Sequence, residues 1–457
     1  YRKSYTYVLR PIYMNAFTQK YGTRVMWLLI AVFVASLSYS FYFKARVEVD
    51  ARAYDRIAWN IVQGNGYREM TDGPLQEDNA ILRVGPGYEL FLALIYFIFG
   101  HHYAAVWIAH AFLSTASAFL VFLLARKIFS SDPARDTMAL IASALIGLSP
   151  DIITVNGLLL TETLGVFLII LCAYLFFKYF VSEIRSGWQI FYVGIVLAFA
   201  IMVRTPAAFL LFPILFCIYQ RGTKKQAAIF LCTIALVFMP WIIRNFNVYR
   251  TFVPTNLAYG IDLLSGNHKG ATGELEPYMQ NGLYLEEFGI VRGSKLLTLE
   301  ALRFISANPL EFIKLTIYRL SIYFSLSRPT GFWFHLGATG KTITIILSAL
   351  YSIFLFVFGF FGLYASQKLS DADRRKARYL AAMLIMMPLA VIGIIVETRY
   401  RFLSYPFFAI FAGYGAVIAW RKEILRSLVV IALMLFANTA FDAIRSMDKI
   451  IEHIRAL

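Results

Sequence analysis

The stretch Arg24–Phe43, RVMWLLIAVFVASLSYSFYF, is followed after a short polar segment by Asp50-Ala-Arg-Ala-Tyr54-Asp55. A run of about 20 apolar residues is long enough to cross the hydrocarbon core as a helix, at ~1.5 Å per residue. The sequence therefore predicts a membrane helix with a carboxylate fixed where the chain leaves the bilayer. Asp50 in that position can meet a substrate whose tail stays in lipid.

Composition extends this prediction to the whole chain. Of its 457 residues, 59% are hydrophobic and 15% are charged, and the mean hydropathy is +0.64. These values are typical of an integral membrane protein built from α-helices. The net charge of +16 is attributed to loops that face anionic lipid, so no nucleic-acid partner is expected. The cysteines lie inside apolar runs and show neither disulfide nor metal-binding spacing.

Long apolar runs divide the chain into membrane spans. They cover residues 24–43, 103–126, 137–150, 163–181, 188–203, 207–219, 226–243, 342–366, 379–396, 403–420 and 425–441. We expect an all-α fold with about 11 transmembrane helices, within a range of about 10–13 because several runs are short. Clusters of lysine and arginine fall at alternate ends of these spans, and those ends are assigned to the cytoplasm. The basic, acid-free segment before Arg24 predicts a retained anchor with a cytoplasmic N-terminus.

This layout leaves two large external loops, at residues 45–100 and 244–340. Each contains an apolar stretch, 90–99 in the first and 312–326 in the second, which we expect to lie along the interface. No internal repeat divides the chain. We therefore expect one membrane domain over residues 1–457, with the 244–340 loop as an external cap.

Five arginines depart from the positive-inside pattern, because they map to external ends of spans. They are Arg83, Arg204, Arg244, Arg399 and Arg401. Each one alone is explained equally well by a side chain that reaches up to lipid headgroups. As a set they favour an anionic headgroup, since the planar guanidinium donates two hydrogen bonds to phosphate. They are the candidate donor-phosphate ligands.

Acidic residues near the same boundaries form the second half of a candidate site. They are Asp50, Asp55, Glu77, Asp78, Glu162 and Glu397. Simpler roles compete with catalysis: a helix cap for Asp50, first-turn acids for Asp55 and Glu162, and an ion pair with Arg399 for Glu397. No expected span carries an acid near its centre, which argues against an ion-coupled transporter. No Walker A sequence or Gly-x-Ser-x-Gly elbow is present, so we expect no nucleotide cofactor.

Several short motifs, taken in order along the chain, resemble the bacterial GT-C glycosyltransferases related to dolichyl-phosphate-mannose protein mannosyltransferases and the lipid A aminoarabinose transferase. The motifs are Asp50-Ala-Arg-Ala-Tyr54, Gly64-x-Gly66-Tyr67, Arg83-Val-Gly-Pro86-Gly87-Tyr88, Thr161-Glu162, Pro240-Trp241 with Arg244-Asn245, and Glu397-x-Arg399-Tyr400-Arg401. One position departs from the family pattern, because Ala51 replaces the usual second acid of the opening motif. Asp55, one helical turn further on, could replace that acid.

The resemblance implies a GT-C fold and transfer of a sugar from a polyprenyl-phosphate donor to an acceptor hydroxyl, with inversion at the anomeric carbon. Asp50 would be the general base, and Asp55 and Glu162 would form a second acidic site near the acceptor. A lipid or glycan acceptor is preferred over protein. The expected place is the bacterial inner membrane, with the site on the periplasmic side.

Metal dependence stays open at this stage. In some relatives an acid of the first loop and a histidine of the large loop hold a metal ion, and Glu77, Asp78 and His268 are the candidates here for a divalent cation. Two other functions also stay open. One is a flippase or binding protein for lipid-linked sugars, and the other is a glycan polymerase or ligase that uses polyprenyl-diphosphate donors.

Overall fold

Helices make up almost all of the ordered architecture in the computed structural model, which describes residues 22–181, 188–326, 335–447 and 451. Within these residues no strand is present, and Glu274 and Val396 form an isolated parallel bridge. The all-α prediction is therefore confirmed. The basic segment expected to be the cytoplasmic N-terminus, up to residue 21, lies outside the described residues.

The helices follow one another in a simple order along the chain. They are α2 (Thr23–Phe43), α3 (Asp50–Val62), η2 (Asn79–Leu82), α4 (Pro86–Phe99), α5 (Tyr103–Ile128), α6 (Arg135–Gly147), α7 (Pro150–Asn156), α8 (Glu162–Phe176), η3 (Phe177–Val181), α9 (Gln189–Val203), η4 (Thr205–Leu210), α10 (Leu211–Arg221), α11 (Lys224–Tyr249), α12 (Tyr259–Gly266), α13 (Met279–Ala307), α14 (Pro309–Tyr323), α15 (Ala338–Ala365), η5 (Ser366–Lys368), α16 (Asp371–Ile392), η6 (Thr398–Ser404), α17 (Tyr405–Trp420) and α18 (Leu425–Arg445).

Each apolar run expected from the sequence falls largely within one or two of these helices. Among the described residues, 7 helices are long and apolar enough to cross a membrane, and the pair α6 and α7, bent by 46°, makes an eighth if it is one span. Shorter apolar helices are formed by Pro86–Phe99, Gln189–Val203 and Thr205–Arg221. The chain is a multi-pass membrane protein, and the number of about 11 spans stays a prediction.

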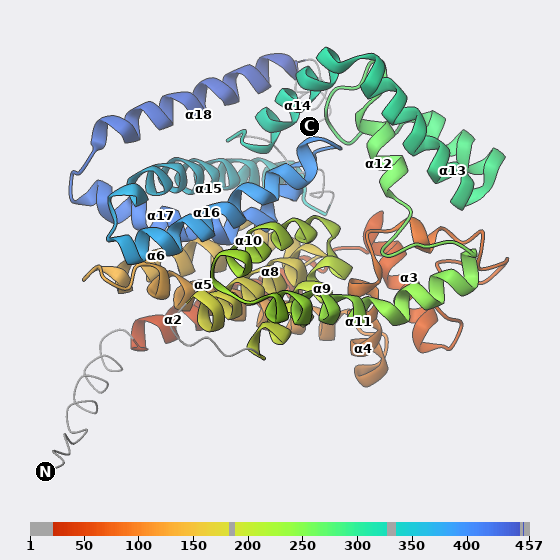
Figure 1. Cartoon of the computed structure of the whole chain (residues 1–457), viewed down its shortest axis with the longest axis horizontal. Coiled ribbons are helices and arrows are strands. Elements are labelled where there is room, and N and C mark those ends of the chain that lie inside the picture. The colour runs from red at the N-terminus through yellow and green to blue at the C-terminus, as the bar shows by residue number, and fades with distance from the viewer. Residues whose placement is uncertain (1–21, 182–187, 327–334, 448–450, 452–457) are drawn as a thin grey trace, which may run out of the picture.

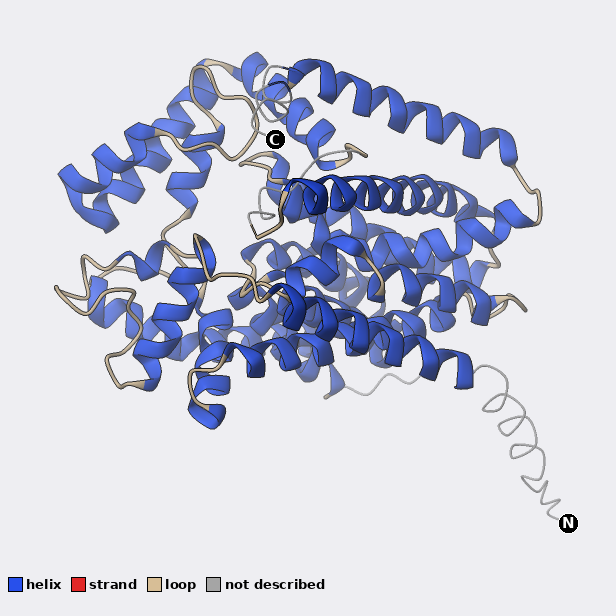
Figure 2. Ribbon diagram, turned by 180° about the vertical axis from the view of Figure 1, so that it is seen from behind, coloured by secondary structure: helices blue, strands red, loops and turns tan. Residues whose placement is uncertain are grey.

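The long helices run side by side, and the loop helices gather at one end of them. In Figure 1 this end is on the right, where α3, α4, α12 and α13 lie together; Figure 2 shows the same end from behind. The chain reaches this end from α2 through α3, and from α11 through α12 and α13. The two expected external loops therefore meet in space.

Close contact between backbones explains the glycines of the first loop. Gly85 has φ +146°, and a Cβ there would collide with the carbonyl oxygen of Met202 at the end of α9. At Gly87 a Cβ would lie 2.7 Å from Val203 Cγ2. Only glycine allows this approach. The motif that contains Arg83 is thereby pressed against the residues that precede Arg204.

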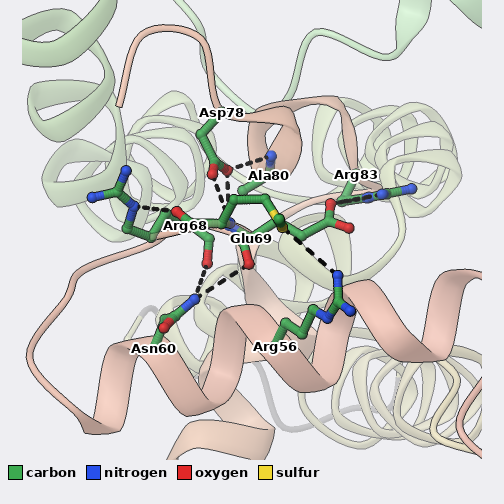
Figure 3. Close-up of polar contacts among 8 residues, drawn as sticks. Arg56, Asn60, Arg68, Glu69, Asp78, Ala80 and Arg83 are labelled. Carbon is green, nitrogen blue, oxygen red and sulfur yellow. Dashed lines mark hydrogen bonds and ion pairs between the residues drawn. The ribbon is translucent and has the colours of Figure 1, made fainter. Parts of the chain in front are cut away.

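A buried carboxylate shapes the rest of the first loop. Asp78 accepts backbone hydrogen bonds from Glu69 and Met70 at 2.8 Å each and from Ala80 at 2.9 Å (Figure 3). Arg83 Nη2 lies 2.6 Å from Glu69 Oε2, and Asn60 donates to the carbonyl of Arg68 at 3.0 Å. These bonds fold residues 60–83 back onto α3.

The large loop is fastened at both ends of α12. Before the helix, Leu257 N donates to the carbonyl of Ile81 at 2.9 Å, which joins the large loop to the first loop. After it, Asn267 donates to the carbonyl of Ile394 at 3.2 Å. Arg319 of α14 is fully buried, donates to Asn267 Oδ1 at 3.0 Å and also donates to the carbonyl of Gly266. The loop is thus fixed over the end of the bundle.

The contact between Gly87 and α9 generates the first prediction. Gly87→Ala should lower the free energy of unfolding by about 1–3 kcal/mol, because the new methyl group must displace backbone atoms of α9. Thermal unfolding of the protein in detergent measures the change. Gly282→Ala is the matched control, since Gly282 is also helical and has open space around it. Equal stability of the two variants would contradict the close contact.

Candidate functional site

Arg399 is the centre of a charged cluster at the loop end of the bundle. Its Nη2 donates to Asp50 Oδ2 at 2.8 Å, and its Nε donates to Glu397 Oε2 at 2.7 Å. The same Nε lies 3.7 Å from Glu162 Oε1. Arg399 is only 7% exposed. One guanidinium group thus brings together carboxylates from three segments that are far apart in the sequence.

A second arginine meets the same cluster from the other side. Arg204, which ends α9, lies with Nη1 3.1 Å from Glu162 Oε1 and donates to Thr161 Oγ1 at 3.0 Å. Glu162 is the first residue of α8 and is fully buried. Its carboxylate lies at the positive end of the helix and beside both guanidinium groups. The ring of Tyr400 lies 5.2 Å from the guanidinium of Arg204.

Sequence reasoning missed one carboxylate of this cluster. Asp262 lies on α12 in the large loop. Burial, together with repulsion from Asp50, raises its pKa to about 7, against the opposing effect of Arg204 and Arg399. The signal was an acid within the apolar sequence Tyr259-Gly-Ile-Asp-Leu-Leu of a loop otherwise expected to be exposed. Such a position predicts a carboxylate that faces protein rather than water.

Negative charge exceeds positive charge within this cluster. Its four carboxylates belong to Asp50, Glu162, Asp262 and Glu397, and its two guanidinium groups belong to Arg204 and Arg399. Burial raises the pKa of Glu397, and repulsion from Glu162 and Asp50 adds to the rise, while Arg399 opposes it. A proton on Asp262, whose pKa is raised to about 7, reduces this excess by one charge. The cluster can therefore adjust its net charge near neutral pH.

Of the arginines expected to bind phosphate, Arg204 and Arg399 lie in the cluster. Arg83 is close enough to Asp50 for their charges to interact, although its own partner is Glu69. Arg244 instead donates to the carbonyl of Tyr67 at 2.8 Å, which supports the first loop. Arg401 is buried within the bundle and donates to the carbonyl of Ser325 at 2.7 Å. The expected set of five thus separates into arginines in or near the cluster and arginines that support the fold elsewhere.

Asp55 lies apart from the cluster, in a network of its own. It accepts hydrogen bonds from Tyr96 at 2.7 Å and Tyr103 at 3.1 Å, and His101 Nε2 lies 2.8 Å from its Oδ1. These partners lie at the end of α4, in the turn that follows it and at the start of α5. Asp55 therefore ties α3 to the bundle. Glu162, the other half of the expected second acidic site, does lie beside Asp50's partner Arg399.

The residues expected to hold a metal do not gather into one ligand set in the described part of the chain. Both oxygens of Asp78 accept backbone hydrogen bonds, and Glu77 is exposed. The ring of His268 stacks on Tyr278 at 3.8 Å, with its Nδ1 2.9 Å from the carbonyl oxygen of Lys269. No group of three or more metal-ligating side chains occurs among the described residues. We derive no step through a metal ion.

Comparison with known proteins agrees with the motifs. Residues 83–243 match the family model described as dolichyl-phosphate-mannose-protein mannosyltransferase, so the resemblance expected from the sequence is confirmed over that range. This range includes the Arg83 motif, Glu162 and Arg204, and ends just before Arg244. No curated protein matches the chain in sequence.

Solved structures show the fold. The apo oligosaccharyltransferase of Archaeoglobus fulgidus is similar with a TM-score of 0.50 and 15% identity, over 92% of this chain and 54% of that one. The archaeal oligosaccharyltransferase AglB in complex with a peptide and a dolichol-phosphate has a TM-score of 0.49 and 14% identity, over 94% of this chain and 56% of that one. ArnT from Cupriavidus metallidurans bound to undecaprenyl phosphate has a TM-score of 0.45 and 13% identity, over 90% of this chain and 63% of that one. The chain thus spans a little over half of the length of the structures it matches, and it shares a GT-C fold with the first of them.

The buried pair of Glu162 and Arg204 leads to the second prediction. Glu162→Gln should lower the free energy of unfolding by about 3–5 kcal/mol, because it leaves Arg204 buried without its full counter-charge. Thermal unfolding in detergent tests this change. The matched control is Glu300→Gln, which removes the exposed partner of Arg303 and should change stability by at most about 1 kcal/mol. An equally small effect at Glu162 would contradict the proposed pairing.

Proposed function

We propose that the chain transfers a sugar from a polyprenyl-phosphate donor to an acceptor hydroxyl, with inversion at the anomeric carbon. The observation that carries this proposal is the contact of Asp50 with Arg399, beside the buried pair of Glu162 and Arg204. A base and two cations at the end of a membrane bundle suit a donor whose tail lies in lipid. The match to mannosyltransferases over residues 83–243 supports the same chemistry.

Asp50 is the proposed general base. Its carboxylate removes the proton of the acceptor hydroxyl while that oxygen forms a bond to the anomeric carbon, and the bond from this carbon to the phosphate oxygen breaks on the opposite face. Proton transfer of this kind contributes roughly 10²–10⁴-fold to a rate. No separate acid is required, because the phosphate leaves as an anion once its charge is met.

Arg399 and Arg204 are the proposed ligands of the leaving phosphate. Both already have carboxylate partners, so the donor has to compete for their N–H groups. When Arg399 turns toward phosphate, it releases Oδ2 of Asp50, and this oxygen becomes free for the acceptor hydroxyl. Donor binding would thus activate the base at the moment when it is needed.

The large loop is the proposed cover of the reaction. Its helix α12 brings Asp262 to the cluster, and Asn267 and Arg319 tie it to the segment just before Glu397. A cover that excludes water suppresses hydrolysis, which is the competing reaction. The acceptor is proposed to be a lipid or glycan. The proposed place is the bacterial inner membrane, with this end toward the periplasm and the N-terminus in the cytoplasm.

Asp50→Asn separates the proposed function from its alternatives. Transfer from a polyprenyl-monophosphate sugar should fall by about 10²–10⁴-fold, because the amide cannot accept the proton, while binding of the donor is retained. Radiolabelled sugar transfer and donor binding by the purified protein measure the two effects. Asp72→Asn is the matched control, since Asp72 is an exposed acid of the same loop.

Three results would contradict this assignment. An unchanged rate of sugar transfer in Asp50→Asn would show that Asp50 is not the general base. Flipping of the lipid-linked sugar across vesicles without any transfer would favour a flippase. Transfer only from polyprenyl-diphosphate donors would favour a polymerase or ligase.

The titration of Asp262 gives a pH prediction. Its pKa is raised to about 7, so it is mostly neutral below this pH and gains a negative charge as the pH rises through it. That charge opposes the donor phosphate, so donor affinity should fall between about pH 6 and 8. In Asp262→Asn this decrease should be absent. Binding of the intact polyprenyl-phosphate sugar, which does not itself titrate in this range, tests both statements at several pH values, and an unchanged decrease in the variant would contradict the role of Asp262.

A further inference from the structure

Two buried positive charges lie close together in the carboxylate cluster. Arg204 Nη1 lies 3.1 Å from Oε1 of Glu162, and Arg399 Nε lies 3.7 Å from the same oxygen. Arg204 is 4% exposed and Arg399 is 7% exposed. Like charges at this separation repel each other, and burial strengthens the repulsion because little water screens it. Any other contact that the two arginines share therefore helps to set their spacing.

The ring of Tyr400 is a second group that both arginines share. Its centre lies 5.2 Å from the guanidinium carbon of Arg204 and 6.0 Å from that of Arg399. Both distances are within the range at which the negative face of an aromatic ring attracts a cation. The two arginines come from different segments, since Arg204 ends α9 and Arg399 lies in η6. The ring therefore attracts both of them toward one place.

Tyr400 is itself held in position by its backbone and by its side chain. Its N–H donates to the carbonyl of Glu397 at 3.0 Å. Its side chain packs against a small apolar group that joins α14, α16 and the segment before η6. This group consists of Ile322, Tyr323, Ala390, Val391 and Val396. The ring is thus fixed to the frame of the bundle, and it can fix the long, flexible arginine side chains that contact it.

A ring and a carboxylate hold a guanidinium group in different ways. A carboxylate accepts N–H hydrogen bonds, and each bond that it takes is lost to a ligand. An aromatic ring attracts the cation through its electrostatic quadrupole and does not use up the N–H donors that lie in the guanidinium plane. Tyr400 can therefore keep the two arginines together while a phosphate takes their N–H groups.

We propose that Tyr400 is a positioning residue that sets the spacing of Arg204 and Arg399 for a single phosphate group. This inference rests on the proposed function, in which both arginines bind the donor. The donor phosphate has two free oxygens, and each can accept from one guanidinium group when the two groups are held together. Without the ring, the two arginines would separate under their mutual repulsion and would no longer bind the same phosphate.

Binding of undecaprenyl phosphate by the purified protein at a single pH tests this proposal, with undecaprenol as the neutral comparison. Tyr400→Leu should weaken binding of undecaprenyl phosphate by about 10-fold and leave binding of undecaprenol unchanged, because only the phosphate depends on the arginines. Tyr400→Phe keeps the aromatic face and should bind both lipids as the native chain does. The KM for the polyprenyl-phosphate sugar should follow the same order.

A control variant removes a similar contact elsewhere in the bundle. The ring of Tyr379, on α16, lies 5.7 Å from the guanidinium of Arg221 at the end of α10. Tyr379→Leu should leave the affinity for both lipids unchanged. A double variant tests whether Tyr400 acts through an arginine. Adding Tyr400→Leu to Arg204→Gln should weaken binding of undecaprenyl phosphate by much less than 10-fold, because the two side chains act as one unit.

Three outcomes would overturn the proposal. Equal weakening for undecaprenol in Tyr400→Leu would reveal a structural role, and equal weakening in Tyr400→Phe would assign the effect to the hydroxyl group. Full additivity with Arg204→Gln would separate the ring from the arginine. The binding measurements do not require sugar transfer. A protein that binds undecaprenyl phosphate through Tyr400 and transfers no sugar would contradict the proposed function alone.

Discussion

A guanidinium group buried at the end of a membrane bundle needs hydrogen-bond acceptors around it, and anionic ones stabilise it most, because desolvation of a lone charge is very costly. Arg399 meets this requirement with Asp50, Glu397 and Glu162. These partners stand 349, 2 and 237 positions away from it along the chain. By pairing with them, one side chain fixes the first loop, the start of α8 and the segment before η6 relative to one another. Fold and candidate chemistry therefore depend on the same contacts.

The same requirement explains the other arginines on this side. Arg83 pairs with Glu69, Arg204 pairs with Glu162, and Arg401 lies 3.9 Å from Asp151. Arg244 uses backbone and aromatic partners instead. Their number alone therefore does not identify phosphate ligands. What distinguishes Arg399 and Arg204 is that their partners belong to a cluster whose carboxylates outnumber its guanidinium groups, so that protons or a ligand can redistribute the charge.

Hydropathy was sufficient to predict the long apolar helices, because each of them is a local run of apolar residues. The sequence placed Asp50, Glu162, Arg204 and Arg399 on the same side of the membrane. It did not indicate which of them pair with one another. Local sequence could not show that Asp55 faces Tyr96, or that Asp78 folds the first loop, because these partners depend on tertiary packing. Asp262 was missed for the same reason. A loop acid becomes part of a site only when its helix docks.

The arrangement of paired charges has a consequence for the order of events in the proposed reaction. Asp50 begins as the partner of Arg399, so its Oδ2 already accepts a hydrogen bond and is not free for the acceptor hydroxyl. A donor phosphate that enters the cluster competes for the same guanidinium group, because its two free oxygens can accept the paired hydrogen bonds of an arginine. Asp50 would then lose its counter-charge while the donor gains it. A site built in this way has an active base only when the donor is bound, which also limits wasteful reaction with water.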